Sequence, residues 1–290
     1  MYDTFFNQEL NKLKFEGRYR VFIDLTRHAS NPPYATWHSS DGDKEVVVWC
    51  SNDYLGMSNH SDVISASIDA TKSYGVGSGG TRNISGTSHV HVELEKTIAN
   101  LHSKEAGLLF TSGYVANEAT LSTLGRSLKD CVFFCDEKIH ASMIQGVKHS
   151  GAHKHIFSHN DLSDLEKKLS LYPKEAPKII AFVSVYSMNG DFAPIKEIVT
   201  LAKKYNAMTY LDEVHAVGIY GEHGAGVAQE VGEEKNIDVI QGNFAKAYGV
   251  IGGYITGSKA LVDFVRSHAS GFIFTTSLPP MVAAAAMESI

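Results

Sequence analysis

The stretch that decides the fold is residues 209–253, and its first part is TYLDEVHAVG (209–218). A short apolar run at 208–211 ends in Asp212, and His215 follows three residues later. An apolar run that stops at an acid is typical of a strand whose carboxyl end carries a functional side chain. In an α/β sheet, such an end faces the crevice where ligands bind.

The second part of the stretch is QGNFAKAYGVIGG (241–253). The apolar residues at 239–240 lead into a turn of small residues that carries Lys246. A lysine just beyond one strand and an acid at the end of another can face the same crevice. Glycines surround the lysine and allow close backbone approach at four positions: Gly242, Gly249, Gly252 and Gly253.

This pair of side chains suits pyridoxal phosphate. A lysine can form a Schiff base with the aldehyde, and a carboxylate can keep the pyridine nitrogen protonated so that the ring accepts electrons. Asp212, His215 or Lys246 alone could equally be an ordinary solvated side chain. Their combination with the glycines favours the cofactor site.

Composition limits the class of protein. With 290 residues, 43% of them hydrophobic and 20% charged, the chain has the make-up of a globular protein with a large core in one or two domains. The net charge of −6 argues against nucleic-acid binding, which needs a basic face. No apolar run approaches the roughly 20 residues of a membrane span, and residues 1–17 resemble neither a signal nor a transit peptide. Cys50, Cys131 and Cys135 form no zinc pattern, so we expect a reducing, cytoplasmic location without membrane partners.

Alternating strand and helix patterns predict an α/β fold with a mainly parallel central sheet flanked by helices. We expect residues 1–45 to form an N-terminal arm and residues 46–290 a large cofactor-binding domain. The predicted strands are 46–50, 107–110, 132–134, 179–186, 208–211, 239–240 and 252–256. The predicted helices include 88–103, 161–171, 194–205 and 258–268.

Two loops and one helix start are candidate ligand sites. The loop GVGSGGTRNISG (75–86) lets its backbone approach a ligand, although it fits neither a dinucleotide fingerprint nor a P-loop and could be simply flexible. A strand, a Ser-Gly turn and a helix start make an anion seat of Ser112, Gly113 and Tyr114. The hydroxyls of Thr275, Thr276 and Ser277 could also reach a phosphate.

Several histidines require a choice between binding and packing. His140 follows a predicted strand and could either stack on a cofactor ring or pack. Gly151 interrupts the helix between the first two of four neighbouring histidines, and no carboxylate lies at a matching ligand spacing, so we predict no metal site. These histidines are His149, His153, His155 and His159.

The chain resembles the α-oxoamine synthases, enzymes of fold-type I that use pyridoxal phosphate, and among them most closely those that make 5-aminolevulinate. The similarity extends from about Phe15 to the last residue. The motifs that carry it are EGRYR, WCSNDYLGM, GSGGTRNISGT, HASMIQG, SVYSMNGD, LDEVHAVGIYG, AKAYGVIGGY and GFIFTTSLPP.

The resemblance implies a role for each matching residue. Lys246 would hold the cofactor and take a proton from glycine, Asp212 would pair with the ring nitrogen, and His140 would stack on the ring. His215 would bind the ring oxygen, with Ser187 nearby. The other residues assigned to the cofactor, mainly to its phosphate, are Ser112, Gly113, Tyr114, Asn243, Thr275 and Thr276, with Thr276 acting across a dimer interface.

The implied substrates are glycine and succinyl-CoA, and the implied assembly is a homodimer with a shared active site. Residues that match positions holding the succinyl group are Arg20, Asn52, Thr81, Asn83 and Ile84. The GTRNISG loop favours this acyl group over those of relatives that make aminoketobutyrate or aminooxopelargonate. The sequence also leaves open a non-catalytic homologue that dimerises with an active partner, and a fold-type I aminotransferase.

The chain departs from the family pattern in places. Asn243 and Phe244 stand where the family usually has Thr and Leu, and Ile139 stands where Asn usually precedes the stacking histidine. Val183 and Asn189 replace residues that are usually acidic. Family members also continue into a small C-terminal domain with the arginine that binds the glycine carboxylate. We therefore expect that this chain is truncated and that this domain is missing.

Overall fold

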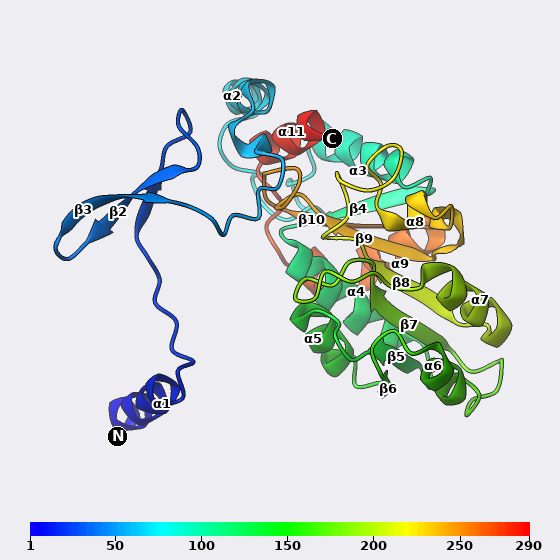
Figure 1. Cartoon of the computed structure of the whole chain (residues 1–290). Coiled ribbons are helices and arrows are strands. Elements are labelled where there is room, and N and C mark those ends of the chain that lie inside the picture. Colours follow the sequence, from blue (N-terminus) through cyan, green and yellow to red (C-terminus); the bar gives the residue numbers. More distant parts are fainter. The chain divides into compact units, whose positions relative to one another are not determined.

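The computed structural model describes all 290 residues and divides them into two compact units, Met1–Ser51 and Asn52–Ile290 (Figure 1). The first unit contains helix α1 (Tyr2–Phe15) and an antiparallel sheet of three short strands. These strands are β1 (Leu25–Arg27), β2 (Tyr34–Ser39) and β3 (Gly42–Val47).

The strand predicted at 46–50 is therefore displaced. It ends at Val47, which pairs with Tyr34, and it starts at Gly42 directly after a tight turn. The Ser39 hydroxyl donates to the carbonyl of Gly42 at 2.6 Å, and Gly42 has a φ of 108°. This turn fixes the register of the hairpin, which the apolar run alone does not reveal.

The second unit is built on a seven-stranded sheet with the order β4-β10-β9-β8-β7-β5-β6. Neighbouring strands from β9 through β8, β7 and β5 to β6 are parallel, and only β10 runs antiparallel to its neighbours β4 and β9. The predicted, mainly parallel sheet is thus confirmed. The strands are β4 (Ala106–Phe110), β5 (Val132–Asp136), β6 (His153–Phe157), β7 (Lys178–Val183), β8 (Met208–Asp212), β9 (Val239–Asn243) and β10 (Gly253–Gly257).

Helices cover both faces of this sheet (Figure 1). They are α2 (Ser61–Tyr74), α3 (His89–Leu101), α4 (Gly113–Ser127), α5 (Ala141–Ser150), α6 (Leu162–Leu169), α7 (Ile195–Tyr205), α8 (Val227–Glu230), α9 (Lys259–His268), α10 (Ser270–Ile273) and α11 (Pro280–Ser289). Short 3-10 turns occur at Met57–Asn59 and Glu234–Asn236. None of the helices combines the length and apolar character that a bilayer crossing requires.

Apolar runs explain why the sheet is central. Every residue of β5 (VFFCD) and β7 (KIIAFV) is buried, as expected for parallel strands covered on both faces. In α7, the buried positions Ile195, Ile198, Val199 and Ala202 follow helical spacing and face the core. The four predicted helices are confirmed, with ends that differ by a few residues.

Two differences from the predicted strands matter near the site. The strand expected at 179–186 stops at Val183, because the chain then folds back through an antiparallel bridge between Val185 and Phe192. Strand β6 is not predicted by the sequence pattern, since its sequence HKHIF holds only two apolar residues.

The register places the functional strand ends side by side. Val183 lies opposite Asp212, and Asp212 lies opposite Gln241. The carboxyl ends of β7, β8 and β9 therefore meet at one edge of the sheet.

Candidate active site

A crevice opens at this edge of the sheet, with about 500 Å³ of space including its open mouth. It brings together eight of the predicted site residues: Gly113, Tyr114, His140, Ser187, Asp212, His215, Asn243 and Lys246. Its other lining residues are Asn117, Lys138, Ser142, Val183, Tyr186 and Val214. The sequence analysis did not identify the polar members of this second group.

The turn after β9 presents Lys246. Phe244 and Gly252 are joined by a backbone hydrogen bond of 3.0 Å, and the Gly249 N–H donates to the Lys246 carbonyl at 2.9 Å. Gly249 has a φ of 65°, and a Cβ at this position would collide with the backbone nitrogen of Ser58. Burial lowers the pKa of the half-buried Lys246 amine, although nearby Asp212 opposes the shift. The amine is therefore more easily deprotonated than an exposed lysine.

Asp212 is held at the end of β8 with only 3% of its surface exposed. The Val214 N–H donates to Oδ1 at 2.9 Å, and the side-chain amide of Asn117 donates to Oδ2 at 2.8 Å. Burial raises the pKa of Asp212, while these two hydrogen bonds favour its charged form. A cation placed against this carboxylate would be strongly favoured, because the surroundings are poorly solvated.

Asn117 and Ser142 link Asp212 to His140. The Asn117 amide also donates to Ser142 Oγ at 3.0 Å, and Ser142 Oγ lies 2.7 Å from His140 Nδ1. The Tyr210 hydroxyl donates to Asn117 Oδ1 at 2.8 Å, which fixes the amide orientation. The sequence offered one weak signal for Asn117: it is a polar residue one turn after Gly113 on a helix that faces the sheet.

His215 is paired with Tyr54, another residue that the sequence analysis missed. The Tyr54 hydroxyl lies 2.7 Å from His215 Nδ1. Burial, with help from Lys246 and His140, lowers the pKa of His215 to about 4. The imidazole is therefore neutral near pH 7. If Tyr54 donates to Nδ1, the proton is on Nε2, which is then a hydrogen-bond donor.

The start of α4 forms an anion seat of Gly113, Tyr114 and Asn243. The first N–H groups of a helix lack intrahelical acceptors and attract negative charge. Ser112 caps this helix, accepting from the Val115 N–H at 3.2 Å, and does not line the crevice. A Cβ at Gly113 would lie 3.1 Å from the Asn243 Cβ, so the seat has no room for a larger residue.

The residues present fit a phosphate-bearing pyridine ring. Asn243 Oδ1 is buried and has no hydrogen-bond partner in the protein. An oxygen acceptor cannot bind a phosphate, so the NH₂ group is the part of this amide that could donate to one. The crevice also offers the buried carboxylate of Asp212, and Lys246 lies on its wall. The unusual Asn243 therefore occupies a place from which its amide can serve a phosphate.

Other predicted residues lie outside the crevice. Thr275 and Thr276 line a separate hollow with Arg82 and Phe272. The loop residues Thr81, Asn83 and Ile84, and also Asn52, are absent from the crevice lining. Arg20 belongs to the first unit.

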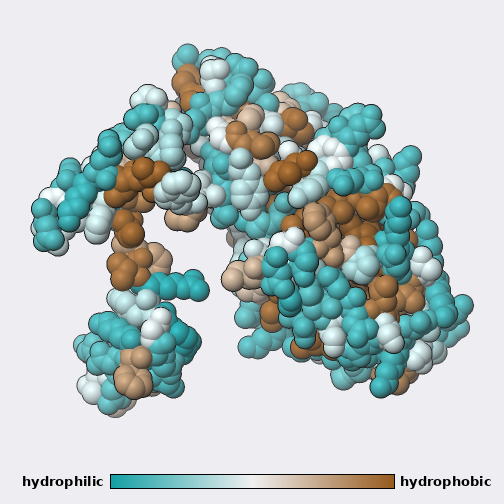
Figure 2. Space-filling model, in the orientation of Figure 1, coloured by the Kyte–Doolittle hydropathy of each residue, from teal (hydrophilic) through white to brown (hydrophobic).

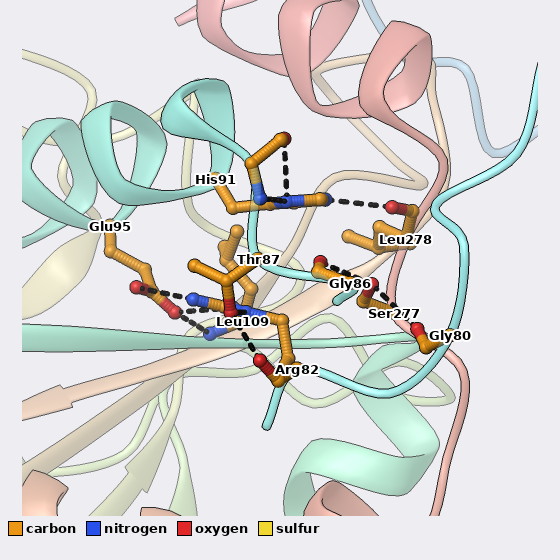
Figure 3. Close-up of polar contacts among 10 residues, drawn as sticks. Gly80, Arg82, Gly86, Thr87, His91, Glu95, Leu109, Ser277 and Leu278 are labelled. Atoms are coloured by element: carbon orange, nitrogen blue, oxygen red, sulfur yellow. Dashed lines mark hydrogen bonds and ion pairs between the residues drawn. The ribbon is translucent and has the colours of Figure 1, made fainter. Parts of the chain in front are cut away.

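The loop at 75–86 is anchored to α3 and β4 through the contacts of Arg82 and Glu95 (Figure 3). Arg82 donates to both carboxylate oxygens of Glu95 at 2.8 and 3.0 Å, and its Nε donates to the Thr87 hydroxyl at 3.0 Å. The Glu95 side chain also accepts from the Leu109 N–H at 3.1 Å, which ties α3 and the loop to β4.

Segment 275–278 closes onto the same loop (Figure 3). The Ser277 hydroxyl donates to the Gly86 carbonyl at 2.6 Å, and His91 Nε2 lies 2.7 Å from the Leu278 carbonyl oxygen. An isolated bridge joins Thr81 to Thr276. Loop 75–86 and the 275–278 hydroxyl cluster are therefore one connected structure.

No three His, Cys, Asp or Glu side chains are grouped closely enough to hold a metal ion. The four neighbouring histidines are used separately. His149 lies 2.8 Å from Glu118 Oε1, His155 lies 2.8 Å from the Tyr172 hydroxyl and His153 packs edge-on against His155. His159 contacts Asp136 and Asp191.

Comparison with known proteins places these features in a family. Residues 44–290 match the aminotransferase class I and II family. The chain is 57% identical over 289 residues to 5-aminolevulinate synthase of Rhizobium meliloti (strain 1021), covering 100% of this chain and 72% of that protein. It is 55% identical to 5-aminolevulinate synthase of Rickettsia prowazekii (strain Madrid E), covering 69% of that protein.

Solved structures show the same fold. Serine palmitoyltransferase of Sphingomonas wittichii is 33% identical with a TM-score of 0.89, and the match covers 99% of this chain and 70% of that one. A structure of SPT with PLP is 35% identical, with a TM-score of 0.88 over 98% of this chain and 70% of that one. 8-Amino-7-oxononanoate synthase of Francisella tularensis is 27% identical, with a TM-score of 0.70 over 83% of this chain and 67% of that one.

Proposed function

The chain belongs to the aminotransferase class I and II family and, within it, to the 5-aminolevulinate synthases, and we propose on this premise how its own residues carry the reaction. The enzyme uses pyridoxal phosphate to condense glycine with succinyl-CoA. Coenzyme A and the carboxyl group of glycine are released, and the product is 5-aminolevulinate, the first intermediate of this route to haem. The observation that carries the residue assignments is that Asp212 and Lys246 line one crevice.

Asp212 is the residue that holds the ring nitrogen of the cofactor in its protonated form. When bound, pyridoxal phosphate supplies a cationic ring that accepts the electrons left when glycine loses its α-proton. Two hydrogen bonds, from Asn117 and Val214, favour the charged form of the Asp212 carboxylate against the effect of burial and fix its orientation. A buried carboxylate that is held in place needs no solvent reorganisation during the reaction.

Lys246 anchors the cofactor and moves the proton. Because burial lowers the pKa of the amine, Nζ is more readily available to take the α-proton of glycine than the amine of an exposed lysine. His140, held by Ser142, would pack on the face of the ring, and His215, held by Tyr54, would donate from Nε2 to the ring oxygen when Tyr54 donates to Nδ1. Ser187 lines the same wall of the crevice, near the ring oxygen or the substrate.

The phosphate is held by the backbone N–H groups of Gly113 and Tyr114 and by the amide of Asn243, with Ser112 acting indirectly as the cap of α4. Thr275 and Thr276 serve the phosphate site of a second copy. Their position in a separate hollow supports this assignment, because they are not in the crevice of their own chain.

A homodimer with shared active sites is supported by apolar side chains of the first unit. Phe15, Phe22 and Trp49 are each more than 90% exposed, and Figure 2 shows apolar residues on the surface of this unit. Such residues are usually covered by a partner. We assign residues 1–45 to an arm that contacts the partner and residues 46–290 to cofactor binding. The cytoplasmic location stays a prediction.

Succinyl-CoA is bound by Arg20, Asn52, Thr81, Asn83 and Ile84. The anchored loop supports the role of its three members, because a fixed backbone can present side chains reproducibly to an acyl group. In the structure, the Thr81 hydroxyl donates to Asn83 Oδ1 at 2.6 Å, which leaves the Asn83 NH₂ group available as a donor. An amide donor suits the terminal carboxylate of the succinyl group.

The competing functions have weaker support. Curated 5-aminolevulinate synthases are 51–57% identical to this chain, whereas the structures of enzymes that use other acyl groups are 27–35% identical. A non-catalytic subunit has no need of Lys246 or of a buried network around Asp212. A simple aminotransferase has no need of the anchored GTRNISG loop.

The test is coenzyme A release by the purified full-length protein with pyridoxal phosphate, glycine and each of succinyl-, acetyl- and pimeloyl-CoA. We expect release with succinyl-CoA first and a visible absorbance band that shifts when glycine is added. Lys246→Ala should abolish both, whereas Lys259→Ala, at an exposed position on α9, should change neither. Absence of coenzyme A release from the full-length protein with glycine and succinyl-CoA would refute the proposed function.

A further inference from the structure

His159 lies outside the crevice, yet it joins two segments that form the crevice wall. Its Nδ1 is 2.9 Å from Asp136 Oδ1 at the end of β5, and its Nε2 is 2.8 Å from Asp191 Oδ2 in the loop after β7. The His159 side chain is 11% exposed, and that of Asp136 is 1% exposed. Both ring nitrogens are therefore occupied by carboxylates in a largely dry place.

Asp136 orders the segment that leads to His140. Its Oδ1 accepts from the Lys138 N–H at 2.8 Å, and its Oδ2 accepts from the Asn160 N–H at 2.9 Å. Lys138 and His140 both line the crevice. A change in the Asp136 carboxylate is thus transmitted to the residue proposed to stack on the cofactor.

Asp191 closes the loop that carries Ser187. The Tyr186 N–H donates to the Asp191 carbonyl at 3.0 Å, and the Gly190 N–H donates to the Tyr186 carbonyl at 2.8 Å. The Tyr186 ring meets the His159 ring edge-on at 4.4 Å between centroids. Tyr186 and Ser187 line the crevice, whereas His159 does not. His159 therefore supports this wall through its contacts with Tyr186 and Asp191.

The arrangement requires a charged imidazole. A neutral imidazole has one N–H, so one of the two carboxylates would face a lone pair, whereas an imidazolium donates to both. The other groups near the ring are the Tyr186 side chain, the neutral amide of Asn160 at 3.3 Å, and Lys138, whose charge acts on Asp191. Burial by itself would lower the pKa of His159, but the hydrogen bonds and charges of Asp136 and Asp191 raise it above its usual value.

We propose that His159 is a positioning residue for the condensation, and that as an imidazolium it clamps loop 184–192 and the 136–140 turn into the shape that the crevice needs. This inference rests on the proposed function. The sign of its pH dependence follows from the direction of the shift. The clamp is complete below the ordinary histidine pKa of about 6.5, and it is lost as the pH rises through the higher pKa of folded His159.

Amide hydrogen exchange measured by mass spectrometry tests the clamp without any turnover. We expect that peptides covering 184–192 exchange faster in His159→Gln than in the unmodified chain. With exchange corrected for the intrinsic rate at each pH, protection of the unmodified chain should fall as the pH rises above about 6.5, through the raised pKa of folded His159. His149→Gln is the matched control, because it removes a histidine–carboxylate pair of the same 2.8 Å length on α5.

Kinetics then separate positioning from folding. His159→Gln should lower kcat for coenzyme A release about tenfold, the effect of one charge-assisted hydrogen bond, and it should flatten the alkaline limb of the pH profile. Asp191→Asn, at a side chain that is 40% exposed, should retain the fold and lose part of kcat in the same direction. His149→Gln should leave both unchanged.

Unchanged protection of 184–192 in His159→Gln, or a pH profile identical to that of the unmodified chain, would overturn the inference. An unmodified full-length protein that fails to release coenzyme A would instead overturn the proposed function, and the exchange measurement would still decide whether the clamp exists. If His159→Gln proves unfolded, Asp191→Asn decides by the same two readouts.

Discussion

Asn117→Ala removes the side chain that connects Asp212 with Ser142 and His140. Asp212 has two hydrogen bonds from the protein, and the substitution deletes the one to Oδ2, 2.8 Å long, while the Val214 N–H remains. Hydrogen bonds to charged groups contribute about 1.5–3 kcal/mol. At about 1.4 kcal/mol for each factor of ten, the loss corresponds to roughly 10- to 150-fold.

The loss should affect cofactor affinity and kcat more than substrate affinity. With the Asn117 side chain removed, the buried Asp212 carboxylate has one donor fewer, so its protonated form is favoured. The attraction between Asp212 and the protonated ring nitrogen of the cofactor is then weaker. The assay is a titration of pyridoxal phosphate followed by its absorbance band, together with kcat and KM for both substrates. Urea unfolding of the same protein measures how much of the change is global destabilisation.

Asn236→Ala is the matched control. Asn236 also donates its amide to a carboxylate, Glu233 Oε2 at 2.7 Å. It is exposed and precedes the amino end of β9, whereas the crevice residue Asn243 lies at the carboxyl end of that strand. We expect no change in cofactor affinity or kcat for this variant. If Asn117→Ala kept both quantities within about twofold of the unmodified chain, the reasoning that Asp212 depends on this network would be refuted.

Three further substitutions probe the supports of the site. Tyr54→Phe should weaken cofactor binding about five- to tenfold, because neutral His215 loses the partner that fixes its tautomer; the absorbance titration measures it. Gly249→Ala should lower the free energy of unfolding by more than about 1 kcal/mol and lower kcat. The added side chain would collide with the 3-10 turn at Met57–Asn59, and Gly249 has a positive φ. Urea unfolding and the release assay check this. Arg82→Met should destabilise by about 3–5 kcal/mol by leaving Glu95 buried without its cation, whereas the double change with Glu95→Leu should recover most of that loss; a double-mutant cycle in urea decides.

The sequence predicted the features that follow from strand order and strand ends. Asp212 and Lys246 each follow an apolar run, and such runs in an alternating α/β chain form neighbouring parallel strands whose ends share an edge. His140 and Ser187 also lie just beyond predicted strands, so the same argument places them at this edge of the sheet. The residues of the sequence, together with the family resemblance, were therefore sufficient to predict the fold class, the cofactor and the reaction.

The differences between predicted and observed strands have local causes. The strand expected at 46–50 is displaced because a hairpin turn at residues 40–41, and not the apolar run, sets the pairing of β3. The strand expected to reach residue 186 ends early because the hydrogen bonds between Tyr186 and residues 190–191 favour a turn. Strand β6 escapes prediction because an edge strand of polar residues has no hydrophobic alternation to reveal it.

The polar residues behind the site were missed for a more general reason. Three of these residues contact distant partners: Asn117 contacts Asp212, Tyr54 contacts His215 and His159 contacts Asp191, and no motif spans these separations. Only Ser142 lies close in sequence to its partner, His140. Asn117 lies 95 positions from Asp212, and Tyr54 lies 161 positions from His215. Their partners are fixed only when the sheet register brings the strand ends together. A residue that touches the cofactor can be recognised by its place at a strand end, whereas a residue that orients it is defined by the fold alone.

Residues beside the phosphate seat and residues around Asp212 should respond differently to substitution. Asn243 replaces a threonine of the family pattern, yet it lies beside Gly113 at a helix start whose backbone N–H groups attract the phosphate whatever side chain is nearby. Asp212 has no comparable set of backbone donors. Its charged form is favoured by only two hydrogen bonds, from the Asn117 amide and the Val214 N–H, in a buried place. Substitutions around the phosphate seat should therefore change affinity in small steps, and substitutions behind Asp212 should change the chemistry itself.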